Sequence, residues 1–424
     1  MYKKTVAALA LPLLLQAHTL HELFAALKTH PQTLRDETAV RQARIAQDKA
    51  NAALYPKIDL FGSYDNYSTP TGMVPLPPNE LFTMIKDPRT PQPFAYNIYR
   101  IGASLSMPVF VQSIFTFAKK AEAMQRSARA KKRINRIKNQ AVIVGADADL
   151  LYLDALNKAI EGKARSLRAT QKTLKIKVAN GRAPASALYK LDDSLNQVAI
   201  TKNSIALQRQ KLLAQIERLT GIRLDAPVPL KQIGSFKAGD FAALEPLRRK
   251  IEADRLDLEA HKERLYPSLV ARGNYVRSYG EAYNNDKSVY ESYGSIGAVL
   301  NIPIVHMDRY ADIDEAKIAL SADEIELQKR LDELRADAEA LETSLPLLEN
   351  SITLYRKSID NKRRLLRIAK LNYKTGRLST EEYLRYEDDV VEAEARLYKA
   401  RAQKWQTLMQ LAVIYANPIE EIIE

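Results

Sequence analysis

The stretch YPKIDLFGSY at Tyr55–Tyr64 returns as YPSLVARGNY at Tyr266–Tyr275, with Tyr, Pro, Gly and Tyr at a constant offset of 211 residues. A second pair recurs at an offset of 195: RIGASLSMPVF at Arg100–Phe110 and SIGAVLNIPIV at Ser295–Val305. Solenoid repeats are about 20–50 residues long, far shorter than this period. The sequence therefore predicts two copies of one structural half.

Residue types around these stretches favour a mostly helical, exported chain. The 424 residues include 14 glycines and no cysteine, which excludes disulfides, thiolate metal sites and cysteine nucleophiles. Lys3-Lys4, an apolar run and Ala17 form the pattern of a signal peptide over residues 1–17. A buried N-terminal helix is the alternative. No other stretch reaches the roughly 18 apolar residues of a membrane-spanning helix, so we expect an exported protein without one.

The net charge of +13 bears on which molecules the protein could bind. A basic chain invites a nucleic-acid interpretation, but export argues against nucleic acid as a partner. Acidic partners, lipopolysaccharide or an acidic half of the repeat remain open.

Long segments with helical periodicity occupy most of both halves. Their apolar residues alternate steps of three and four, the spacing of helices that pack side by side as coiled coils. Pro346 lies inside one of them and is expected to kink the helix or break its hydrogen bonding locally. The expected long helices are Val109–Val178, Ala183–Thr220, Val305–Lys374 and Ser379–Tyr415, and shorter ones are expected at Gln32–Leu54 and Phe241–Leu265.

Between the helices lie four strand-like segments, in pairs at 56–108 and 267–303. Alternate residues are apolar, as in Ile58, Leu60, Gly62 and Tyr64, which suits transmembrane β-barrel strands of about ten residues. Tyrosines concentrate around these segments, as an interfacial girdle requires. A soluble, half-buried sheet is the alternative. The Pro-rich loop 70–93 and the polar loop Gly280–Val289 are expected to be extended and solvent-facing.

Four strands cannot close a barrel, and an open edge in lipid leaves backbone groups without partners. Small closed barrels need about eight strands. If the strand prediction holds, the chain must oligomerise. Two copies would supply about eight strands and three about twelve, and the pattern does not choose between them.

The order of these motifs carries a family resemblance. HTLHELFAALKTHPQTL after the signal, AALYPKIDLFGSY, both IGA-L--P junctions and the two Gly-Arg turns occur in sequence. The chain resembles the TolC-like outer membrane efflux proteins, or outer membrane factors, over essentially its whole length. The resemblance implies mainly α structure: a homotrimer with a 12-stranded barrel in the cell outer membrane and a long coiled-coil α-barrel extending into the periplasm. It also implies a periplasmic adaptor (membrane fusion) protein and an inner-membrane pump as partners; whether the pump is of the RND, ABC or MFS type stays open.

The expected domain boundaries follow from the repeat and the resemblance. They are a signal peptide at 1–17, repeat 1 at 18–222 with its tip at 179–183, an equatorial linker at 223–240, and repeat 2 at 241–424 with its tip at 374–379 and a C-terminal tail.

Two turns, ANGRAPASALYKL at Ala179–Leu191 and KTGRLSTEEYLRY at Lys374–Tyr386, join the long helices to the shorter ones. Glycine ends a helix readily in the left-handed conformation, and Ser379 or Thr380 can cap the next helix. The plain alternative is two helix hairpins with no further role. By resemblance, these tips dock the adaptor and constrict the channel, through Gly181, Arg182, Gly376 and Arg377.

The resemblance also places a gate at the second tip. Tyr373 falls at the position of a gating tyrosine and Glu382 at that of an acidic, cation-sensitive constriction. The expected gate arginine is Leu378 here, with Arg377 one place early. The second acidic position is Arg385, so the closed-state network departs from the family's pattern.

Two oppositely charged bands occupy equivalent places in the halves. Lys119–Lys138 holds nine bases and one acid, and Asp314–Glu333 holds seven acids and three bases. Two solvated faces are the usual explanation. The sharper hypothesis is that the bands lie at one height on neighbouring helices and attract each other around a ring. The residues singled out are Arg126, Arg129, Arg133, Arg136, Asp323, Glu324 and Glu326.

Nothing in the sequence indicates catalysis. The five histidines are scattered without metal-ligand spacing, and no glycine loop could cradle a phosphate. We therefore expect no enzyme, no cofactor and no metal. The leading interpretation is a passive exit duct for small toxic compounds. The alternatives are the outer-membrane component of a type I protein secretion system and an exported coiled-coil structural or polyanion-binding protein.

Overall fold

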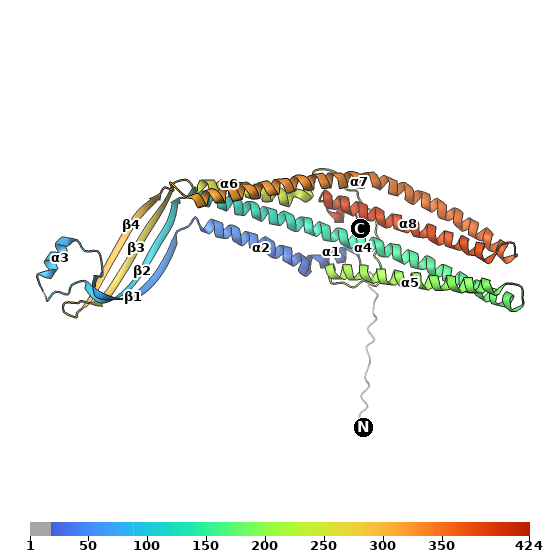
Figure 1. Ribbon diagram of the computed structural model, residues 1–424, viewed down its shortest axis with the longest axis horizontal. Coiled ribbons are helices and arrows are strands. Elements are labelled where there is room, and N and C mark those ends of the chain that lie inside the picture. Colours follow the sequence, from blue (N-terminus) through green and yellow to red (C-terminus); the bar gives the residue numbers. More distant parts are fainter. Residues whose placement is uncertain (1–17, 88) are drawn as a thin grey trace, which may run out of the picture. The chain divides into compact units, whose positions relative to one another are not determined.

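The computed structural model describes residues 18–87 and 89–424 (Figure 1). The predicted signal peptide lies outside them. The chain divides into two compact units, each built from both halves of the repeat. The first holds the residues up to Ala39 with Ala130–Glu245 and Gln328–Glu424, and the second holds Val40–Arg129 and Pro246–Leu327.

The second unit contains one antiparallel sheet of four strands in the order β1-β2-β3-β4. The strands are β1 (Lys57–Gly72), β2 (Phe94–Phe110), β3 (Ser268–Glu281) and β4 (Ser288–Asn301). Both predicted strand pairs are confirmed, and the strands are longer than expected, at 14 to 17 residues. Because β2 pairs with β3, the two halves of the repeat form one sheet. Within the described residues β1 and β4 are its two edges.

The register collects the apolar side chains on one face of this sheet. Ile58 lies opposite Leu105, Leu105 opposite Gly273, and Gly273 opposite Ile296. In the single chain this face is open to solvent: Leu60 is 83% exposed and Ile296 is 96% exposed. So large an exposed apolar face marks a surface that a membrane or another chain covers.

The Pro-rich connection between β1 and β2 corrects one expectation. It contains a short helix, α3 (Pro78–Ile85), where an extended loop was predicted. Pro78 stands at the first helical position, which suits proline because its missing N–H needs no partner there. Asn284 of the β3–β4 loop accepts a hydrogen bond from the backbone N–H of Gln92 (3.1 Å) and donates one to the carbonyl of Thr90 (3.0 Å). The connection is thus tied to the other hairpin.

The long helices are as the heptad spacing predicts, within three residues at each end. Their bounds are α4 (Gln112–Ala179), α5 (Ala185–Thr220), α7 (Met307–Lys374) and α8 (Thr380–Ile414). The helix α7 continues through Pro346, and the predicted kink or local break in its hydrogen bonding stays a prediction. None of the described helices combines the length and the apolar composition needed to cross a membrane.

The shorter helices precede the strands, with one addition. The expected ones are α2 (Pro31–Ala52) and α6 (Glu245–Glu263), the latter after the 3-10 turn η1 (Ala242–Leu244). The sequence did not single out α1 (Leu20–Thr29), which starts with a capping box between Thr19 and Glu22. Pro31 begins α2 directly after it.

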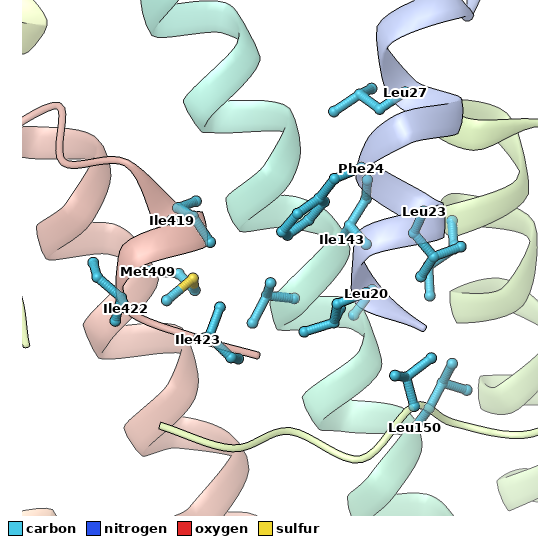
Figure 2. Packing of buried hydrophobic residues seen from close by; sticks show 14 of the residues in the cluster. Leu20, Leu23, Phe24, Leu27, Ile143, Leu150, Met409, Ile419, Ile422 and Ile423 are labelled. Carbon is cyan, nitrogen blue, oxygen red and sulfur yellow. The ribbon is translucent and has the colours of Figure 1, made fainter. Parts of the chain in front are cut away.

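The main core of the first unit lies where α1, α4 and α8 meet the linker and the C-terminal tail. Figure 2 shows Leu20, Leu23 and Phe24 of α1 beside Ile143 of α4. The tail, which includes the 3-10 turn η2 (Ile419–Glu421), packs from the other side. It also pairs with the linker: Lys231 and Glu424 exchange two backbone hydrogen bonds of 2.9 Å. The two segments are therefore joined by backbone hydrogen bonds.

Candidate functional site

Both predicted tips have the same backbone structure. Gly181 and Gly376 have φ of +66° and +77°, the left-handed conformation that favours glycine. The N–H of Arg182 donates to the carbonyl of Lys177 (2.7 Å), and that of Arg377 to Asn372 (2.9 Å). This pattern satisfies the last helical carbonyls of α4 and α7. The repeated Gly-Arg pair is therefore a helix-ending device at both tips.

The helix α8 is capped by the residue that the sequence suggested. Ser379 accepts a hydrogen bond from the N–H of Glu382 (3.2 Å), and the Glu382 carboxylate accepts from the Ser379 N–H (2.9 Å) and hydroxyl (2.8 Å). These bonds from Ser379 lower the pKa of Glu382. In the single chain, the carboxylate predicted to line a constriction thus caps its own helix.

Tyr373 packs in an aromatic pair at the second tip. Its ring stacks on that of Tyr383 with centroids 4.9 Å apart, and Lys177 of α4 lies over it at 5.5 Å. Its hydroxyl is 3.4 Å from Thr380 Oγ1. Tyr373 is therefore held between the last turn of α7 and the first turns of α8, with a cation from the other hairpin beside it.

A buried polar network joins the two hairpins one helical turn further along α8 from Tyr383. The Glu387 carboxylate accepts hydrogen bonds from the Tyr383 hydroxyl (2.6 Å) and from Ser166 of α4. Burial and the neighbouring Glu387 raise the pKa of Tyr383 to about 12. Sequence reasoning missed this network, because Ser166 and Glu387 lie 221 residues apart and only packing brings them together.

A groove of about 790 Å³ separates the tips of the two hairpins. Four of the predicted tip residues line it: Arg182, Tyr373, Gly376 and Arg385. The Lys190–Glu381 ion pair (2.8 Å) crosses from α5 to α8 beside it, where both side chains are exposed. The other three predicted residues, Gly181, Arg377 and Glu382, do not line the groove and are exposed.

The charged bands pair with a helix that the sequence did not connect to them. In the second unit, Arg126 of the basic band binds Glu252 of α6 at 2.8 Å. On the acidic band, Asp323 binds Lys250 of α6 at 2.5 Å and Glu324 binds Arg255 at 2.8 Å. Glu252 of α6 thus meets α4, and Lys250 and Arg255 of α6 meet α7, so α6 links the two bands within one chain.

The remaining band residues lie elsewhere on the same helices. In the first unit Arg133 binds Glu245 at 2.6 Å and Arg136 binds Glu420 at 2.9 Å. Arg129 is exposed, and Glu326 is half-buried on α7. Direct attraction between the bands of neighbouring helices around a ring stays a prediction.

Asp147 is a buried carboxylate in the middle of α4 that sequence reasoning also missed. Its side chain is fully buried. One oxygen accepts the backbone N–H of Val228 in the linker (2.9 Å), and the other finds no hydrogen-bond partner among the described residues. Burial, only partly offset by that hydrogen bond, raises the pKa of Asp147 to about 7. The available signal was an acid within the apolar run AVIVGADADLL.

Known proteins resemble this chain in structure but not detectably in sequence. By sequence, the chain matches no family model and no curated protein. By structure, it resembles the CmeC outer membrane channel of Campylobacter jejuni with a TM-score of 0.77 and 16% identity, over 93% of this chain and 85% of that one. The chain has the TolC-like fold.

Two further structures agree. The outer membrane protein VceC of Vibrio cholerae matches with a TM-score of 0.74 and 15% identity, over 93% of this chain and 96% of that one. The open state of the MtrE outer membrane channel of Neisseria gonorrhoeae matches with a TM-score of 0.73 and 14% identity, over 93% and 88%. The predicted combination of long helices and a four-stranded sheet is thus confirmed as a TolC-like fold.

In the part of the chain that the structure describes, no three histidine or acidic side chains gather as metal ligands would. The groups of interest are instead the two tips, the α4–α8 network and the salt bridges along α6.

Proposed function

We propose that this protein is an outer-membrane exit duct of a tripartite export system. It conducts small toxic compounds passively from the periplasm to the exterior. The observation that carries the proposal is the match of 93% of the chain to outer membrane channels. A sheet whose apolar face is open to solvent, in a chain with 68-residue helices, supports it.

The sheet also supports oligomerisation. Its two edges, β1 and β4, carry backbone donors and acceptors that lipid cannot satisfy. Closure with copies of the same chain satisfies them, and three copies give a barrel of about twelve strands. The protein then acts as a homotrimer in the outer membrane, with the helices extending into the periplasm.

The gate belongs at the helix tips. The contact of Lys177 with the Tyr373 ring and the exposed Lys190–Glu381 pair join the two hairpins across the groove, and these contacts separate when the hairpins move apart. Exposed ion pairs contribute only about 0–1 kcal/mol each, so docking of a periplasmic adaptor suffices to rearrange them. The pump in the inner membrane supplies the energy.

Two other functions remain to be tested against this one. The first is the outer-membrane component of a type I protein secretion system, which would have the same duct. The second is an exported coiled-coil structural or polyanion-binding protein, whose function would depend on the helices and not on a membrane barrel. The purified protein should conduct ions in planar bilayers, run as a heat-modifiable oligomer and be recovered in the outer-membrane fraction. A soluble protein without conductance would refute the duct.

Deletion of the gene distinguishes a duct for small toxic compounds from a duct for protein secretion. Increased sensitivity to small toxic compounds with unchanged secreted proteins is the expected result. Loss of a secreted protein with unchanged sensitivity would assign the duct to protein secretion instead.

A further inference from the structure

The first unit contains a cavity of about 630 Å³ between α4, α5, α7 and α8, in the part of the helices nearest the linker. Most of its wall is apolar, with Ala146, Leu212, Leu341 and Met409 among the lining residues. Small-molecule sites occupy about 300–1,000 Å³ and combine apolar walls with a few polar groups. This cavity has both properties.

A glycine creates part of this space. A Cβ placed on Gly145 of α4 would meet only the Cγ of Gln406, at 3.8 Å, which is an ordinary contact. Among the described glycines, positive φ occurs at 181, 221 and 376 and not at 145. Mid-helix glycine costs about 0.5–1 kcal/mol relative to alanine. Neither the backbone conformation nor close packing requires a glycine at position 145. The lack of a side chain there leaves space in the cavity.

The charges around the cavity favour a cation. Asp149 of α4 and Asp337 of α7 line it, against the single base Lys138. Asp149 is half-buried and accepts a hydrogen bond from the Gln406 amide at 2.9 Å. Burial raises the pKa of Asp149, so its negative charge is poorly solvated. A positive charge placed nearby would stabilise the ionised carboxylate.

We propose that this cavity binds a lipophilic organic monocation. The apolar wall holds the hydrocarbon part, and the Asp149 carboxylate neutralises the charge. The cavity lies within one chain, so its occupancy can be measured whether or not the protein conducts.

The test is equilibrium dialysis of the purified full chain with two probes of the same shape and opposite charge, tetraphenylphosphonium and tetraphenylborate. We expect saturable binding of the cation and at least about tenfold weaker binding of the anion. Asp149→Asn keeps an oxygen to accept from Gln406 and removes the charge, so it should weaken cation binding about tenfold.

Gly145→Leu fills the cavity and should abolish binding. Its matched control is Gly162→Leu, in the same helix but outside the cavity, where a Cβ meets only the Arg165 guanidinium at 4.0 Å. The control should bind as the wild type does. Emission of Trp405, the only tryptophan, reports whether each variant is folded, since it packs against the neighbouring core. Equal binding of both probes, or binding that survives Gly145→Leu, would overturn the proposal.

Discussion

Asp147→Asn tests whether a buried carboxylate governs the attachment of the linker to α4. The asparagine side-chain oxygen can still accept the Val228 N–H, and only the ionisable group is lost. Asp147 has a pKa of about 7 in the folded chain, against 3.8 for an ordinary aspartate. Its ionisation is therefore unfavourable in the folded state, and the stability that the protonated form contributes is lost as pH rises from about 4 through about 7.

The size of the effect follows from the two pKa values. The folded state loses about 4 kcal/mol over the full titration. Roughly 2–3 kcal/mol of this loss falls between pH 5 and pH 8, because part of it has already occurred at pH 5. The amide introduced by Asp147→Asn does not titrate in this range, so the variant should become more stable than the wild type by that amount as pH is raised.

Hydrogen exchange at the Val228 amide measures this locally, which suits a chain too large for a two-state analysis. After correction for the intrinsic exchange rate, wild-type protection should fall by one to two orders of magnitude between pH 5 and pH 8, and that of Asp147→Asn should not. The matched control is Asp154→Asn on the same helix, whose carboxylate pairs with Lys158 at 2.7 Å on the surface. It should retain the wild-type pH dependence. Equal pH dependence in wild type and Asp147→Asn would refute the assignment.

Three further predictions concern the tips and the charged bands. Glu382→Gln and Glu382→Ala should both reduce single-channel cation selectivity, but only the alanine variant should also lose about 0.3–1.5 kcal/mol of helix stability with the capping box; unchanged selectivity in both would remove the residue from the constriction. Gly376→Ala should lower the free energy of unfolding by about 1 kcal/mol because it forces positive φ on a side chain, whereas Gly162→Ala in mid-helix should raise it by a similar amount; effects of the same sign would contradict the left-handed turn. Charge reversal of Arg129 and Arg133 should dissociate trimers in low salt and much less in high salt, measured by analytical ultracentrifugation; intact trimers in low salt would count against attraction between the bands.

The features that depend on local sequence were predictable. The heptad spacing gave the four long helices, alternation gave the strand positions, and Gly181 and Gly376 gave the turns, since each depends only on neighbours in the chain. The helix α3 was missed because the prolines around it dominate the composition of the loop. Its starting residue, Pro78, was nevertheless a usable signal.

The features that depend on packing were not predictable. The sign of each charged band could be read from the sequence, but α6 as the shared partner could not, because three helices must meet to make those pairs. In the same way, the hydrogen bond between Asp147 and Val228 of the linker joins residues 81 positions apart, which only the fold brings together. The roles of Tyr373 and Arg385 stay predictions, since the contacts in one chain do not reveal what neighbouring chains add.

The central claim is that the sheet closes with other copies of the chain into a ring. The absence of cysteine gives a clean background for cross-linking. One cysteine replaces Ser63 on β1, and a second is scanned over Ser292 and Ser295 of β4, the opposite edge. After oxidation in membranes, denaturing electrophoresis should show species of two and three chains and none larger. Monomers alone, or a ladder continuing beyond three chains, would contradict a closed trimeric barrel.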